Sequence, residues 1–161
     1  MRVVVFANNW LGLQCLNRLK HTGAEIVGLV VHPHERARYR DEIVATAGLA
    51  QDVVFDGSGL RDEGLVDRIG ELKADLALSI LFGFILKEDL IKLFPQGVVN
   101  LHPAFLPYGR GVNTNVWSIV DGTPAGVTMH YVDSGVDTGD IVAQRRVRVL
   151  PTDTGESLYR R

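Results

Sequence analysis

Short apolar runs rich in β-branched residues alternate with stretches of helical periodicity through the first two-thirds of the chain. The runs predict buried strands, and the stretches between them predict helices. The predicted strands are residues 2–7, 24–32, 52–55, 75–80 and 97–101, and the predicted helices are residues 12–23, 38–49, 64–74 and 86–94. Strands joined by helical crossovers run parallel, so we predict an α/β fold with a mostly parallel sheet and helices on both faces.

The last third of the chain has a different pattern. Residues 126–133 and 140–150 both alternate between apolar and polar side chains. These two runs predict neighbouring strands that form an antiparallel edge. A further amphipathic helix begins at Glu156 and has no completed apolar face by Arg161. We therefore expect residues 1–161 to be a single catalytic domain that is truncated at its C-terminus.

Length and composition restrict the class of protein. A chain of 161 residues with a net charge of -2 suits one globular α/β domain and shows no overall charge that favours nucleic acid or membranes. Cys15 is the only cysteine and lies in an apolar, helical run, which predicts a buried thiol rather than a nucleophile. One cysteine allows no internal disulfide, so we expect a cytoplasmic protein, and no apolar run is long enough to predict a membrane span.

Polar side chains gather where predicted strands end. Asn100 and His102 close the run 97–101, and ligands bind beyond the carboxyl ends of parallel strands. A second cluster in HYVDSGVDTGDI holds one histidine, three aspartates and glycines that allow tight turns, namely His130, Asp133, Asp137, Asp140, Gly135 and Gly139. The spacing of the aspartates does not match a calcium loop, so we predict no metal. We expect a carboxylate instead to fix the tautomer of an imidazole and to stabilise its charged form.

Asparagine, histidine and aspartate together favour acyl chemistry. The amide and a protonated imidazole are both donors for the oxyanion of a tetrahedral intermediate, and the aspartate keeps the imidazole charged. The chain has no G-x-S-x-G motif, and Cys15 is badly placed, so direct transfer to an amine is favoured over an acyl-enzyme. Each feature alone is typical of a turn or a structural residue, whereas their joint occurrence at strand ends indicates a site.

The segments NLHPAFLPYGRG and GVTMHYVDSGVDTGDIVAQ resemble the 10-formyltetrahydrofolate-dependent formyltransferases. This family includes methionyl-tRNA formyltransferase, glycinamide ribonucleotide transformylase and the sugar N-formyltransferases. The resemblance implies a Rossmann-like formyltransferase domain, 10-formyltetrahydrofolate as co-substrate and the catalytic residues Asn100, His102 and Asp137. It further implies that two loops and one histidine hold the folate, with the residues Leu81, Phe82, Gly83, Phe84, Ile85, His130, Asp133 and Gly135. Ala104 departs from the family, in which a serine is common at this position.

The segments around the first strand and the Gly-Arg-Gly turn bear on the amine. FANNWLGLQ lacks the glycine-rich phosphate loop of the glycinamide ribonucleotide enzymes and is expected to expose Trp10 in a turn. FLPYGRGVNTNVWSI is closer to the sugar enzymes, so the resemblance favours an amino sugar carried on a nucleoside diphosphate, bound by Trp10, Arg110 and Asn113. The basic loop 36–40 is either a second source of cations for phosphates or a solvated surface. Trp117 is either a second aromatic face for the sugar nucleotide or part of the core, and we expect it in the core.

Other functions stay open at this point. The amine is alternatively that of methionyl-tRNA or glycinamide ribonucleotide, and nucleic acid is a partner only if the substrate is tRNA. A hydrolase that releases formate from the same co-substrate would share the Asn-His-Asp trio. A folate- or dinucleotide-binding module without catalysis is the alternative from another class, although ANNWLG lacks the G-x-G-x-x-G fingerprint. The sequence leaves the oligomeric state open, a homodimer included.

Overall fold

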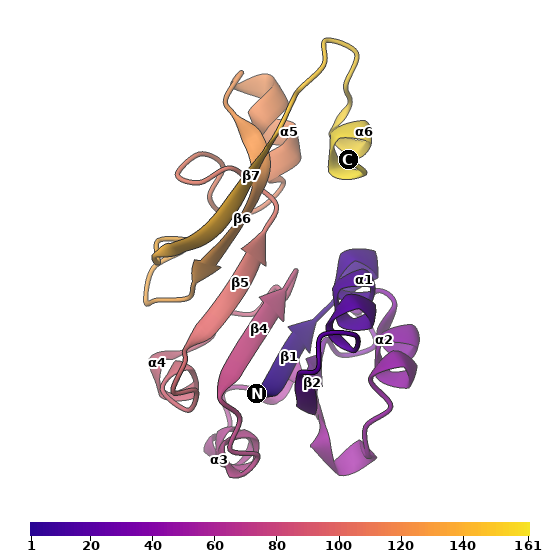
Figure 1. Cartoon of the computed structure of the whole chain (residues 1–161), viewed down its shortest axis with the longest axis vertical. Helices are drawn as coiled ribbons and strands as arrows, with labels where there is room; N and C mark the ends of the chain where they lie inside the picture. Colours follow the sequence, from indigo (N-terminus) through magenta and orange to yellow (C-terminus); the bar gives the residue numbers. More distant parts are fainter. The chain divides into compact units, whose positions relative to one another are not determined.

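The computed structural model describes all residues from Met1 to Arg161. The chain forms two compact units, Met1–Val99 and Asn100–Arg161 (Figure 1). None of the helices combines the length and the apolar character that a membrane crossing requires.

The first unit is built on parallel strands. They are hydrogen-bonded in the order β3-β2-β1-β4, with the bounds β1 (Arg2–Ala7), β2 (Glu25–Val31), β3 (Val54–Asp56) and β4 (Leu76–Ile80). Every pair among them is parallel. The central strand β1 is apolar along its length, and Val3–Phe6 are fully buried because helices cover both faces of the sheet.

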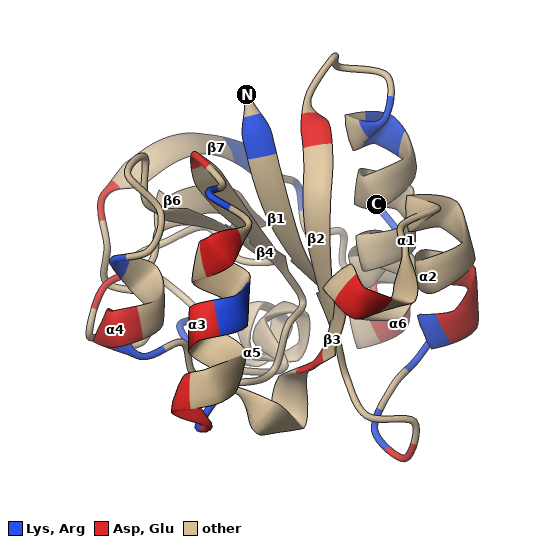
Figure 2. Ribbon diagram, turned by 90° about the horizontal axis from the view of Figure 1, so that it is seen from below, with Lys and Arg blue, Asp and Glu red and all other residues tan.

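The helices of the first unit lie on opposite faces of these strands. Their bounds are α1 (Asn9–Leu19), α2 (Arg40–Ala47), α3 (Glu63–Glu71) and α4 (Glu88–Ile91). In Figure 2, α1 and α2 lie on one side of β1 and β2, and α3 and α4 lie on the other. The strand order explains this division, because right-handed crossovers that run outward from β1 in opposite directions place their helices on opposite faces.

The second unit contains the predicted antiparallel pair. Strand β5 (Val98–His102) enters this unit at Asn100 and is followed by β6 (Ala125–Tyr131) and β7 (Ile141–Val147) in the order β5-β6-β7. β6 and β7 are antiparallel, with an irregularity between Met129 and His130. The predicted strands and helices are thus confirmed, with ends that differ by a few residues.

Helix α5 (Thr114–Val120) has no counterpart among the predicted elements. Its β-branched residues and Asn115 have low helix propensity, so the local sequence does not favour a helix. Tertiary contacts stabilise it instead. The buried hydroxyl of Thr114 donates to the carbonyl oxygen of Pro103, and the buried Ser118 hydroxyl donates to the carbonyl oxygen of Thr114 at 2.9 Å.

The last helix, α6 (Gly155–Tyr159), starts one residue before the predicted position. A capping box explains its start, because the Thr154 and Ser157 side chains each bond to the backbone N–H of the other residue. α6 packs against α5, with Gly155 close to Val116.

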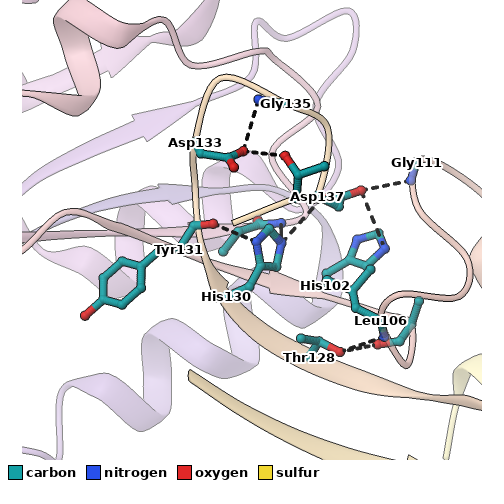
Figure 3. Close-up of polar contacts among 12 residues, drawn as sticks. His102, Leu106, Gly111, Thr128, His130, Tyr131, Asp133, Gly135 and Asp137 are labelled. Carbon is teal, nitrogen blue, oxygen red and sulfur yellow. Dashed lines mark hydrogen bonds and ion pairs between the residues drawn. The ribbon is translucent and has the colours of Figure 1, made fainter. Parts of the chain in front are cut away.

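A buried threonine ties the segment after β5 to β6 and β7. The hydroxyl of Thr128 donates to the carbonyl oxygen of Ala104 at 2.7 Å and accepts from the N–H of Leu106 at 3.1 Å (Figure 3). The amide of Gln144 donates to the same hydroxyl at 3.0 Å and to the carbonyl oxygen of Leu106 at 2.8 Å. One hydroxyl therefore fixes the backbone that directly follows His102.

Replacing Thr128 with valine preserves the shape of the side chain and removes its hydrogen bonds. Buried backbone groups at Ala104 and Leu106 then lose a partner, so the free energy of unfolding should fall by about 2 kcal/mol. For a domain of this size this lowers Tm by roughly 4–8 °C. Thermal unfolding followed by circular dichroism checks the prediction, with the exposed Thr152→Val as the matched control. Equal Tm values for the two variants would contradict it.

Candidate functional site

The end of β5 presents two polar side chains on one face. Asn100 and His102 are two residues apart in an extended strand, so their side chains point to the same side. His102 is buried. His130, near the end of β6, and Asp137, in the loop between β6 and β7, point toward the same place (Figure 3). The structure thus brings together Asn100, His102 and Asp137, and it adds His130.

His102 has two oxygen neighbours at the same ring nitrogen. Nε2 lies 2.8 Å from the carbonyl oxygen of Gly109 and 3.6 Å from Oδ2 of Asp137. A carbonyl oxygen only accepts, so these contacts assign a proton to Nε2.

His130 connects Asn100 to Asp137. Its Nδ1 donates to the carbonyl oxygen of Tyr131 at 2.8 Å, and its Nε2 lies 3.2 Å from Nδ2 of Asn100 and 3.5 Å from Oδ1 of Asp137. The two partners of Nε2 require different protonation states. A hydrogen bond from the Asn100 amide needs an unprotonated Nε2, whereas an ion pair with Asp137 needs a proton there. In the neutral state, His130 therefore orients the amide of Asn100.

Asp137 is held by the backbone as well as by the histidines. Its side chain is 13% exposed, and its Oδ2 accepts the N–H of Gly111 at 2.8 Å. Its φ of 52° lies in the left-handed region, which aspartate tolerates better than most residues. Each carboxylate oxygen faces one imidazole, so a positive charge on either ring has a counter-ion in a largely dehydrated place.

Asp133 has a different role from Asp137. Its Oδ1 accepts the N–H of Gly135 at 3.0 Å and the hydroxyl of Thr138 at 2.6 Å, so this exposed carboxylate closes its own loop. Asp140 is exposed, and no group of three His, Cys, Asp or Glu side chains is placed to hold a metal ion. Thr138 is a residue that the sequence analysis missed, although Asp followed by Gly and a hydroxyl residue is a signal for such a turn.

The predicted folate loop Leu81–Ile85 lies in the first unit, directly after β4. Leu81 has a φ of 49°, Phe82 is buried, and Ile85 is 86% exposed. The N–H of Gly83 donates to Nε2 of His32 at 3.0 Å. His32 is thus a second residue that the sequence analysis missed, because nothing in the local pattern connects the end of β2 with this loop.

The predicted amine-binding residues are all on the surface of their own unit. Arg110 and Asn113 are exposed, and Asn113 has a φ of 55°. Trp10 is 47% exposed, but it lies in the first turn of α1 rather than in a loop turn. The prediction that Trp117 packs in the core is wrong, since its side chain is 52% exposed on α5. Cys15 lies in α1 and is half-buried rather than fully buried as predicted, and partial burial raises the pKa of its thiol, which disfavours the reactive thiolate.

The site gathers an amide, two imidazoles and a carboxylate close to the end of β5. The family model described as Formyl transferase matches residues 1–161. The chain therefore belongs to the formyl transferase family, as the motif resemblance implied.

Two curated relatives and one solved structure illustrate the similarity. The chain is 29% identical to methionyl-tRNA formyltransferase of Alkaliphilus oremlandii, with 100% of this chain and 54% of that protein covered. It is 30% identical to the bifunctional polymyxin resistance protein ArnA of Wigglesworthia glossinidia brevipalpis, with 100% of this chain and 25% of that protein covered.

The crystal structure of phosphoribosylglycinamide formyltransferase from Anaplasma phagocytophilum has a TM-score of 0.84 and 28% identity, and it covers 100% of this chain and 78% of that one. This likeness confirms the predicted Rossmann-like α/β fold class. The chain spans about half the length of the methionyl-tRNA formyltransferases that it matches and a quarter of ArnA.

The loop of Asp133 offers a test of the site geometry. The hydroxyl of Thr138 is the main cause of the lowered pKa of Asp133, followed in the same direction by the N–H of Gly135. Thr138→Val should therefore raise the pKa of Asp133 toward its ordinary value of about 3.9. Because the native pKa is lowered, this carboxylate stabilises the loop above the unfolded-state value, and the effect is lost as pH falls through the native value.

Carboxyl-carbon NMR titration of the wild type and of Thr138→Val measures this change directly. Thr152→Val, which alters an exposed threonine away from the loop, should leave the Asp133 titration unchanged. An identical Asp133 titration in the wild type and Thr138→Val would refute the loop-closing role of this hydroxyl.

Proposed function

We propose that the chain transfers a formyl group from 10-formyltetrahydrofolate to a primary amine. The observation that carries this proposal is the cluster of Asn100, His102 and His130 around the Asp137 carboxylate. Residues 1–161 are proposed to act as one catalytic domain, and the family to which the chain belongs supports the reaction class.

In the proposed reaction, the amine nitrogen attacks the formyl carbon and forms a new C–N bond. The formyl oxygen gains negative charge, which the Asn100 amide and the His102 imidazolium stabilise as hydrogen-bond donors. The tetrahedral centre collapses when the bond between the formyl carbon and N10 breaks. The proton lost by the amine balances the one gained by N10, and Asp137 assists this transfer through the imidazole or through water.

The donor is proposed to bind through backbone groups of two loops and through one histidine. Leu81–Ile85 supports this because the loop follows a parallel strand and exposes the apolar side chain of Ile85. In the other unit, His130 lies beside Asn100, and the Asp133 carboxylate closes the turn to Gly135 by accepting its N–H at 3.0 Å. These assignments follow the family resemblance residue by residue.

An amino sugar carried on a nucleoside diphosphate is the proposed acceptor. Two exposed tryptophans, Trp10 and Trp117, are aromatic faces suited to a base or a sugar ring, and Arg110 is an exposed cation for phosphate. Asn113 adds an exposed amide at the start of α5. The exposure of Trp117 favours this proposal more than the sequence did, because a tryptophan packed in the core would be unable to bind substrate.

Removing the proposed oxyanion donor or its counter-ion should slow turnover without unfolding the protein. We expect His102→Ala to lower kcat by on the order of a hundredfold or more. Asp137→Asn should also lower kcat strongly, since it keeps an acceptor for Gly111 and removes the charge between the imidazoles. Asp133→Asn is the matched control and should have a milder effect. The rate of tetrahydrofolate release measures all three, and near-native activity of His102→Ala would overturn the site assignment.

A panel of amines separates the candidate reactions. The wild type is mixed with 10-formyltetrahydrofolate and, in turn, a dTDP- or UDP-linked 4-amino sugar, glycinamide ribonucleotide, methionyl-tRNA or no amine. We expect the sugar nucleotide to saturate the rate at micromolar to millimolar concentrations, in the usual Michaelis range. Efficient formylation of another amine alone would exclude the sugar substrate but retain formyl transfer. Release that needs no amine would indicate hydrolysis.

A further inference from the structure

His32 is a buried histidine that the proposed chemistry does not use. It follows β2 in the first unit, is 5% exposed, and lies against the loop Leu81–Ile85. Its Nε2 is 3.0 Å from the backbone nitrogen of Gly83 and accepts the hydrogen bond from that N–H. A ring nitrogen that accepts a hydrogen bond carries no proton, so the neutral ring has its proton on Nδ1.

The imidazole also contacts the residues on either side of Gly83. The ring centroids of His32 and Phe82 are 5.1 Å apart, and those of His32 and Phe84 are 4.8 Å apart. The Phe84 ring has a second neighbour, because the guanidinium of Arg36 lies 5.2 Å from its centroid. His32 therefore touches three successive residues of the loop, with one hydrogen bond and two ring contacts.

Contacts with residues outside the loop Leu81–Ile85 fix its conformation. It begins at Leu81, whose φ of 49° is unfavourable for a leucine, and it reaches Ile85, which is 86% exposed. Phe82 is buried and packs on Phe6 of β1, with ring centroids 5.3 Å apart. This side chain anchors one position, and the bond to His32 fixes the peptide that follows it.

The surroundings of His32 favour its neutral form. Burial lowers the pKa of His32, and the positive charge of Arg36 acts in the same direction. Asp56 of β3 and the backbone of Arg36 act in the opposite direction. Arg40 of α2 donates its Nε to the carbonyl oxygen of His32 at 3.2 Å, and Leu81–Ile85 contain no ionisable side chain.

Protonation would disrupt the contact with Gly83. A proton on Nε2 would face the N–H of Gly83, which is itself a donor, and Nδ1 is already buried without a hydrogen-bond partner. Because the native pKa is lowered, the contact is complete above the ordinary histidine range and is lost as pH falls through the native value.

We propose that His32 is a positioning residue, whose unprotonated Nε2 fixes the backbone of Leu81–Ile85 for binding of the formyl donor and releases this loop when the imidazole takes up a proton. The part of this proposal that concerns the donor rests on the proposed function. The part that concerns the loop rests only on the contacts of His32.

Hydrogen exchange at the Gly83 amide tests, without any substrate, whether His32 fixes the backbone of the loop. NMR at neutral pH compares the wild type with His32→Leu, which removes the acceptor, and His32→Gln, whose side-chain carbonyl can replace it. We expect protection of Gly83 to fall at least tenfold in His32→Leu and to be largely retained in His32→Gln. The exposed His34→Leu is the matched control and should match the wild type.

The pH dependence of the same amide tests the protonation step. After correction for intrinsic exchange, protection of Gly83 should fall on acidification in the wild type but not in His32→Gln. If His32→Leu does not fold, the comparison of the wild type with His32→Gln tests the proposal by itself. Equal protection in His32→Leu and the wild type, or the same acid dependence in His32→Gln and the wild type, would overturn the proposal.

Kinetics then test the consequence for the donor. With the amine that the wild type formylates best, His32→Leu should raise KM for 10-formyltetrahydrofolate several-fold with little change in kcat, and His32→Gln should restore KM. A change confined to the KM of the amine would overturn the role in donor binding. If the wild type formylates no amine, the proposed function fails, whereas the exchange experiment still decides whether His32 fixes the loop.

Discussion

The Asp137 carboxylate, held between two imidazoles, is the interaction on which the rest of the site depends. Its oxygens lie 3.6 Å from Nε2 of His102 and 3.5 Å from Nε2 of His130. A carboxylate that is only 13% exposed loses much of its hydration, and this cost is offset only when partners surround it. The N–H of Gly111 and the two rings are these partners, so the loops that carry them must keep their conformation.

This requirement explains the Gly-Arg-Gly turn after the His-Pro segment. Gly109 offers its carbonyl oxygen to His102, and Gly111 offers its N–H to Asp137. Both glycines have positive φ values, of 66° and 86°, which side chains rarely allow. A Cβ at Gly109 would lie only 3.2 Å from the Cβ of Ala104, so the small residue at position 104 and the glycine together allow the turn to approach the imidazole.

The parts of the fold that follow from periodicity were predictable, and the parts that follow from tertiary contacts were not. Strand β5 and the shared face of Asn100 and His102 follow from local pattern alone. Helix α5 has poor propensity and forms because buried hydroxyls bond to backbone carbonyls, which no window of sequence shows. The contact of Asn100 with His130 joins residues 30 positions apart, so the sequence indicated only that His130 belongs to the second polar cluster and, by resemblance, holds the folate.

Three buried histidines show why residue type alone could not assign roles. His102 and His130 each have a carbonyl oxygen as a neighbour, so one ring nitrogen of each donates a hydrogen bond to the backbone, and both rings lie beside the Asp137 carboxylate. His32 faces a backbone N–H and lies near Arg36, so its surroundings favour the neutral ring. The histidines differ in whether the nearest backbone group accepts a hydrogen bond from the ring or donates one to it. An imidazole can therefore donate to a backbone carbonyl oxygen, as His102 does at the end of β5, or accept from a backbone N–H, as His32 does after β2.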